Sequence, residues 1–131
     1  MRLHDKLCRE LYDFLTDTSD AEVFKNIEII GNDKQVRGEI DVLSVYNDFF
    51  DVYEVKSSTH YLNKGRNQLR RNANLVYEIL GLNPREMLLM YPNRDRYLQT
   101  EMVKWTQTNY LKSSNSISQE GNSKEYSMNL I

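Results

Sequence analysis

Two carboxylates and a lysine make residues 38–58 the stretch of this sequence best suited to chemistry. Asp41 lies in one largely apolar segment, and Glu54 and Lys56 end the next one. Hard divalent cations such as Mg²⁺ bind oxygen ligands and are held by one or two carboxylates together with water and phosphate. Asp41 and Glu54 therefore predict a metal site, to which the carbonyl of Val55 would add a third oxygen. Lys56 is placed to stabilise charge on a phosphate or to orient the attacking water.

Basic side chains follow at once, on a helix predicted over residues 60–80. They flank its apolar stripe on both edges and would contact phosphates without reading sequence; they are Lys64, Arg66, Arg70 and Arg71. Gln68 borders the same stripe, so its side chain would reach the site and hold a nucleophilic water or a phosphate. For each arginine taken singly, a solvated helix face is the alternative interpretation.

Strand alternation decides whether the carboxylates meet. Two strands joined by a turn are predicted over residues 37–46 and 49–56. Alternate residues of a strand point to opposite faces, so Glu54 and Lys56 share a face. By the same rule, Asp41 shares a face with Leu43. The register between the strands is critical, because a slip of one residue would send Asp41 to the other face.

The remaining elements predict a single α/β domain with a mixed sheet. Apolar periodicity predicts two further helices, over residues 2–16 and 97–112. Apolar and β-branched runs predict two further strands, over residues 22–30 and 86–91. The domain would span residues 1–112, and the polar composition of residues 113–131 predicts a flexible tail, whose apolar end would be able to anchor it.

Composition narrows the class of protein. The chain has 131 residues, 40% of them hydrophobic, and no apolar run of the ~18–20 residues that a bilayer span requires. Its single cysteine, Cys8, excludes an internal disulfide and a multi-cysteine metal site, which predicts a cytoplasmic, intracellular setting. The net charge of −2 means that any positive surface for nucleic acid must be local.

The motifs resemble those of the PD-(D/E)xK nuclease superfamily. Residues 38–41, Gly-Glu-Ile-Asp, are similar to its GxxD motif, and residues 54–56, Glu-Val-Lys, to its (D/E)xK motif. Gln68 falls where the RecB-like branch carries the glutamine of a QxxxY motif, although Asn72 replaces the tyrosine. The archaeal Holliday junction resolvases are similar in size and carry an early helix glutamate, which Glu10 matches.

This resemblance implies a restriction-endonuclease-like αβββαβ core that hydrolyses DNA with Mg²⁺ or Mn²⁺. It implies metal binding by Asp41, Glu54, the Val55 carbonyl and Glu10, with Lys56 and Gln68 in catalytic roles. Junction cleavage would need two symmetrical cuts and therefore a homodimer.

Two other functions remain open at this point. One is a nuclease of the same fold that acts on RNA, and the other is a non-catalytic subunit that binds nucleic acid. The presence of both carboxylates and the lysine argues against the non-catalytic subunit, since a site that no longer catalyses a reaction has no reason to keep all three. We interpret His4, on the first helix, as a histidine at the edge of the core rather than as a metal ligand.

Overall fold

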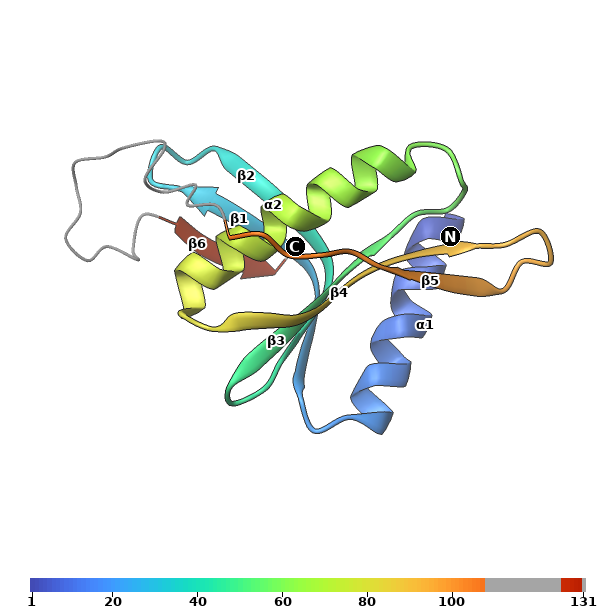
Figure 1. Cartoon of the computed structure of the whole chain (residues 1–131), viewed down its shortest axis with the longest axis horizontal. Helices are drawn as coiled ribbons and strands as arrows, with labels where there is room; N and C mark the ends of the chain where they lie inside the picture. Colours follow the sequence, from blue (N-terminus) through green and yellow to red (C-terminus); the bar gives the residue numbers. More distant parts are fainter. Residues whose placement is uncertain (108–125, 131) are drawn as a thin grey trace.

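The chain folds as a mixed β-sheet with one helix on each face (Figure 1). The computed structural model describes residues 1–107 and 126–130. Its elements, in chain order, are α1 (Leu3–Thr18), β1 (Glu22–Gly31), β2 (Val36–Val45), β3 (Phe49–Val55), α2 (Leu62–Leu80), β4 (Asn83–Pro92), β5 (Leu98–Met102) and β6 (Tyr126–Leu130). The predicted α/β class and the predicted order of the elements up to β4 are confirmed.

The sheet has the strand order β5-β4-β3-β2-β1-β6. All neighbouring strands are antiparallel except β3 and β4, which are parallel and are joined by the crossover helix α2. A parallel pair requires such a crossover, whereas β2 and β3 need only the short turn at residues 46–48. Helix α2 ends at Gly81, whose φ of 72° is the left-handed conformation that favours glycine.

Two apolar clusters hold the helices to the sheet. On one face, Leu69, Ala73 and Val76 of α2 are fully buried against side chains of the sheet. On the other face, α1 packs on a smaller cluster that includes Tyr53 and Val55. Neither of these two helices is both long enough and apolar enough to cross a bilayer.

The buried face of α1 is rotated relative to the predicted one. The apolar periodicity of residues 2–16 predicts that Leu3 and Phe14 lie in the core, but they are 50% and 61% exposed. The side chains that are buried instead are Leu7, Cys8, Leu11 and Leu15. The small, buried Cys8 allows the helix to approach the sheet on this side, and it turns His4, one helical turn earlier, toward the sheet as well.

The helix predicted over residues 97–112 is wrong where the structure describes it. Residues 98–102 form β5, which pairs antiparallel with β4 through a turn at residues 93–96. The predicted helix would turn Tyr97 and Met102 inward, but they are 73% and 68% exposed. Pairing with the edge of β4 gives the backbone regular hydrogen bonds and overrides a weak helical period. Residues 108–112 lie outside the described part of the chain.

The end of the predicted tail belongs to the sheet. Residues 126–130 form β6, which pairs antiparallel with β1. This pairing anchors the apolar end of the tail to the sheet, as its composition allowed. Residues 113–125 of that tail lie outside the described residues.

Candidate metal and nucleic-acid site

Side-chain alternation in β2 is interrupted at Asp41. Ile40 packs in the cluster under α2, yet Val42, two residues on, packs in the cluster under α1. On the neighbouring strand β1, Asn26 lies between the partners of these two residues and has a φ of 55°, unusual for a strand. The expectation that Asp41 shares a face with Leu43 is therefore wrong. Leu43 packs toward α2, whereas Asp41 contacts α1.

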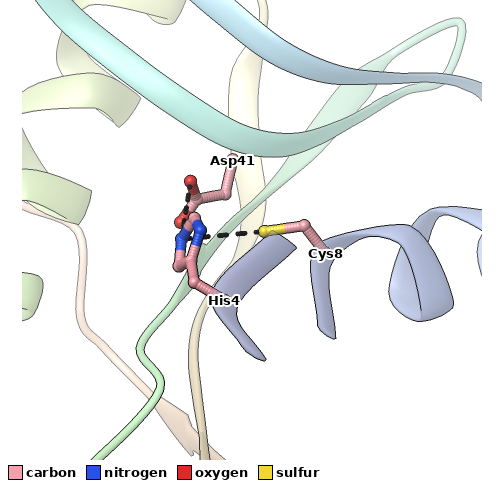
Figure 2. A group of neighbouring side chains, drawn as sticks. All are labelled: His4, Cys8 and Asp41. Atoms are coloured by element: carbon pink, nitrogen blue, oxygen red, sulfur yellow. Dashed lines mark hydrogen bonds and ion pairs between the residues drawn. The ribbon is translucent and has the colours of Figure 1, made fainter. Parts of the chain in front are cut away.

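The two oxygens of Asp41 contact different partners. The pairing of β2 with β3 extends only to Val42, and beyond it Oδ2 of Asp41 accepts a hydrogen bond of 2.8 Å from the backbone amide of Val55. Oδ1 lies 3.3 Å from Nε2 of His4 on α1 (Figure 2). The Asp41 carboxylate thus joins β2, β3 and α1 at one point.

His4 is the residue of α1 that reaches this site. Its Nε2 also lies 3.7 Å from Sγ of Cys8, and the ligand atoms of His4, Cys8 and Asp41 all fall within 4.8 Å of one another. The hydrogen bond to Asp41, reinforced by the contact with Cys8, raises the pKa of His4 to about 11. Without a bound cation, the contact with Asp41 therefore favours the protonated form of His4.

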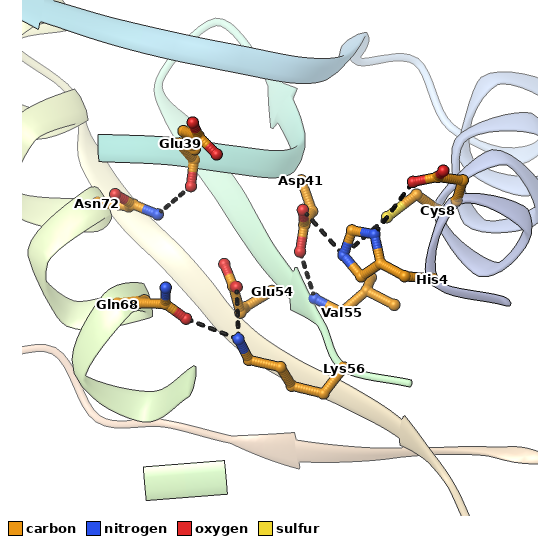
Figure 3. Close-up of polar contacts among 10 residues, drawn as sticks. His4, Cys8, Glu39, Asp41, Glu54, Val55, Lys56, Gln68 and Asn72 are labelled. Atoms are coloured by element: carbon orange, nitrogen blue, oxygen red, sulfur yellow. Dashed lines mark hydrogen bonds and ion pairs between the residues drawn. The ribbon is translucent and has the colours of Figure 1, made fainter. Parts of the chain in front are cut away.

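Glu54, Lys56 and Gln68 meet on the α2 side of the same strand ends (Figure 3). The ammonium group of Lys56 donates a hydrogen bond of 2.8 Å to Oε1 of Gln68 and lies 3.5 Å from Oε2 of Glu54. Glu54 and Lys56 share a face, as strand alternation predicts. Gly65 leaves room for the stem of Lys56, since a Cβ there would lie 3.0 Å from Cε of the lysine.

Glu54 is a buried carboxyl group with an unused oxygen. Only 6% of the residue is exposed, and within the part of the chain described here its Oε1 has no hydrogen-bond partner. Burial and the nearby charge of Asp41 raise the pKa of Glu54 to about 8, although Lys56 opposes this shift. A buried acceptor without a partner is costly, and a bound cation would satisfy it.

The glycine of the GxxD-like motif has a packing role. A Cβ at Gly38 would lie 2.5 Å from Oδ1 of Asn72, which is fully buried on α2. Nδ2 of Asn72 donates a hydrogen bond of 2.8 Å to the carbonyl of Glu39. Asn72, which stands where the RecB-like motif carries tyrosine, therefore ties α2 to the strand that carries Asp41.

Glu10 does not reach this site. Its side chain is 56% exposed and lies 3.9 Å from the ammonium group of Lys6, one helical turn earlier. Of the two helix residues expected to converge on the strand ends, the structure brings only Gln68 there. The rotation of α1 explains the difference, because Glu10 lies on the same side of the helix as the exposed Leu3 and Phe14. His4 and Cys8 are four residues apart and in phase with Leu11 and Leu15. This spacing is the feature of the sequence that indicates which side of α1 faces the sheet.

The predicted basic surface is reduced by one side chain. Arg66 donates two hydrogen bonds, of 2.5 and 2.8 Å, to the carboxylate of Glu101 on β5. Lys64 and Arg70 are exposed on α2, and Arg71 is half-buried. Because the region of Glu101 was expected to be helical, this ion pair was not foreseen.

The strand ends of β2 and β3 thus bring the carboxyl groups of Asp41 and Glu54 close enough for Asp41 to raise the pKa of Glu54, with one lysine and one histidine beside them. Such a set is suited to holding a divalent cation beside a phosphate. Comparisons of the chain with protein-family models, with curated proteins and with solved structures found no match.

Proposed function

We propose that this chain is a metal-dependent nuclease with a restriction-endonuclease-like fold, and that it hydrolyses phosphodiester bonds in DNA. The observation that carries the proposal is the meeting of Asp41, Glu54, Lys56 and Gln68 at the ends of β2 and β3. These residues come from three elements and from both predicted motifs. The order of α1, three strands, α2 and β4 agrees with the αβββαβ core that the resemblance implies.

The donor set fits a hard divalent cation such as Mg²⁺ or Mn²⁺. Asp41, Glu54 and the carbonyl of Val55 would hold it, and the unused Oε1 of Glu54 is the atom that most needs a positive partner. When bound, such a cation polarises the phosphoryl group and lowers the pKa of a bound water. His4 takes the position on α1 for which the sequence suggested Glu10. Mg²⁺ takes oxygen ligands in a strict octahedral geometry, and Mn²⁺, a transition metal, accepts a nitrogen ligand more readily, so we expect Mn²⁺ to support the faster cleavage.

The chain's own side chains have distinct roles in this proposal. The ammonium group of Lys56 stabilises negative charge that develops on the phosphate, because it is a fixed cation in a partly buried position. Gln68 fixes the position of that ammonium group through their hydrogen bond. The amide of Val55 fixes the orientation of the Asp41 carboxylate.

Nucleic acid would approach over the N-terminal half of α2. Lys64 and Arg70 are exposed there, and Arg71 is half-buried, so these three are the residues proposed to contact phosphates. Arg66 contributes less, because Glu101 already neutralises it. Contacts of this kind hold the backbone and carry no sequence information, which suits an enzyme that recognises DNA structure, such as a junction.

The proposal includes a homodimer, because two symmetrical cuts need two active sites. Strand β5 offers a surface for it. It is an edge of the sheet among the described strands, and it carries the exposed Met102 at one end and follows the exposed Tyr97 at the other. Unpaired edge strands readily pair with a second copy. Sedimentation analysis is expected to give twice the chain mass of 15.6 kDa, and the mass of a single chain would refute the dimer.

Cleavage assays on a panel of substrates test the proposed function. The panel comprises linear, nicked, branched and single-stranded DNA, with matched RNA, each with Mg²⁺, Mn²⁺ or EDTA. We expect cleavage of DNA with either metal, none with EDTA, and none by Asp41→Ala. Cleavage of RNA alone would redirect the proposal to an RNA nuclease. Binding of DNA without cleavage of any substrate would refute the enzyme and favour the non-catalytic subunit.

A further inference from the structure

We propose that His4, Cys8 and Asp41 bind Zn²⁺, at a site that shares His4 and Asp41 with the proposed cleavage site. Zn²⁺ bound there would compete with cleavage, and this second part rests on the proposed function. The proposal adds Cys8, which the cleavage mechanism does not use. It also differs in chemistry, because a thiolate is a ligand for Zn²⁺ but not for Mg²⁺.

Two of the three distances between the ligand atoms match a tetrahedral zinc site, and the third, from the Asp41 oxygen to the Cys8 sulfur, is within 4.8 Å. Bond lengths of roughly 2.0–2.2 Å for nitrogen and oxygen, and about 2.3 Å for sulfur, give tetrahedral edges of about 3.4 Å for N···O and about 3.6 Å for N···S. In the structure, Nε2 of His4 lies 3.3 Å from Oδ1 of Asp41 and 3.7 Å from Sγ of Cys8 (Figure 2). An ion would therefore fit among these atoms with little movement of the side chains.

Outer contacts already orient two of the three ligands. Nδ1 of His4 lies 3.3 Å from the carboxylate of Asp5, so the ring would keep its proton on Nδ1 and turn Nε2 toward the metal. The amide of Val55 holds Oδ2 of Asp41, which leaves Oδ1 facing the histidine. Partners of this kind, a carboxylate behind a histidine in particular, are a regular feature of protein metal sites.

Hydrogen bonding alone leaves the three groups poorly matched. Nε2 carries at most one proton, and a single N–H can be well directed at only one of its two neighbours, the Asp41 oxygen or the Cys8 sulfur. Cys8 is only 2% exposed, so water does not offer its thiol an alternative partner. A zinc ion would bind all three groups at once, and the charges of one thiolate and one carboxylate would balance its own.

The site is accessible to solvent through His4 and Asp41. The His4 side chain is 37% exposed and the Asp41 side chain 16% exposed, so an ion can enter from solvent and a water can complete its coordination. Glu54 lies on the α2 side of the strand ends and is not among the ligand atoms that group with Cys8 within 4.8 Å. The pair formed by His4 and Asp41 is therefore available either to Zn²⁺ together with Cys8 or to Mg²⁺ or Mn²⁺ together with Glu54.

Titration with Co²⁺, a spectroscopic substitute for Zn²⁺, tests the site without any measurement of cleavage. The reduced, metal-free protein is expected to give a thiolate-to-cobalt charge-transfer band in the near ultraviolet, which Zn²⁺ abolishes by displacement. In Cys8→Ser we expect this band to be absent and the affinity for Zn²⁺ to fall at least about 100-fold, because losing even an outer partner costs 10–100-fold. Bound Co²⁺ without the band, or wild-type affinity in Cys8→Ser, would overturn the site.

Two further variants separate a lost ligand from a lost fold. Asp5→Asn removes only an exposed outer partner and is expected to weaken Zn²⁺ binding about 10-fold or more. Asp13→Asn changes an exposed carboxylate elsewhere on α1 and is expected to leave Zn²⁺ binding unchanged. Equal affinities in wild type, Asp5→Asn and Cys8→Ser would refute the proposal even if one variant were unstable.

Competition is measured separately, as inhibition of Mn²⁺-dependent cleavage by Zn²⁺. We expect Zn²⁺ to inhibit the wild type at concentrations at least about 10-fold lower than those needed for Cys8→Ser. Equal inhibition of both would overturn the sharing of His4 and Asp41. If the wild type cleaves no substrate, the nuclease proposal fails, and the cobalt spectra still decide whether the zinc site exists.

Discussion

At the scale of single residues, the site depends on how each carboxylate oxygen is used. Asp41 has a backbone amide on one oxygen and an imidazole on the other, whereas Glu54 keeps one buried oxygen without a partner among the described residues. The carboxyl groups of Asp41 and Glu54 therefore differ in whether both of their oxygens have a partner. Asp41 is already oriented, and Glu54 needs a cation or a proton.

The raised pKa of Glu54 predicts how pH affects the stability of the metal-free protein. The folded-state pKa of Glu54 is raised from 4.5 to about 8, so the folded protein keeps the proton that the unfolded chain loses. The free energy of unfolding should therefore fall as pH rises from about 4.5 to about 8, by at most a few kcal/mol. In Glu54→Gln the part of this loss that Glu54 causes should disappear, whereas the part that the raised pKa of His4 causes above about pH 6.5 should remain in both proteins.

Thermal unfolding in EDTA between pH 4.5 and 8.5 measures the effect. The midpoint of Glu54→Gln is expected to rise relative to that of wild type as the pH increases. Glu39→Gln, which changes an exposed carboxylate on β2, is the matched control and should follow the wild type. Parallel curves for Glu54→Gln and wild type would show that Glu54 ionises normally in the folded protein.

At the scale of elements, the sequence predicted which segments are helices and strands better than which side of each faces the site. Strands β2 and β3 and helix α2 follow strong alternation or periodicity, so Lys56 and Gln68 meet as expected. Two local irregularities escaped this reasoning. The left-handed backbone of Asn26 accompanies the altered direction of Asp41, and the buried Cys8 lies on the same side of α1 as His4, which faces Asp41. Neither irregularity can be inferred from the regular spacing of apolar residues in the sequence.

The rotation of α1 predicts opposite outcomes for two neighbouring substitutions. His4→Ala removes the α1 side chain that contacts Asp41, so Mn²⁺ affinity and cleavage should each fall about 10–100-fold. Glu10→Ala removes an exposed side chain that pairs only with Lys6, so both should stay within about twofold of wild type. Calorimetric titration with Mn²⁺ and a cleavage assay measure the two effects. The reverse order would place Glu10, and not His4, at the site.

The contact of β2 with α2 predicts that one methyl group added at Gly38 lowers the stability of the protein. Gly38→Ala would push a Cβ against the buried amide of Asn72, which is held by its bond to β2, and should lower the free energy of unfolding by about 1–3 kcal/mol. Gly31→Ala meets only the exposed side chains of Arg37 and Asp33 and should cost less. Urea denaturation of both variants tests this. Equal losses would mean that the Gly38 contact is not tight.

At the scale of the whole molecule, the α/β class followed from the sequence and the outer strands did not. The segment of β5 has a mixed pattern of apolar and polar residues, and only pairing with β4 decides its conformation. That pairing also places Glu101 beside Arg66 and so reduces the basic surface predicted for nucleic acid. Long-range pairing of this kind is not encoded in local periodicity.

The central claim, a metal-dependent phosphodiesterase site at the ends of β2 and β3, is tested most directly by measuring Mn²⁺ binding and DNA cleavage together in Lys56→Ala. We expect Mn²⁺ binding at least as tight as in wild type, because a nearby positive charge has been removed, and cleavage reduced at least about 100-fold. Lys104→Ala, an exposed lysine next to β5, should change neither. Cleavage by Lys56→Ala at the wild-type rate would contradict the account.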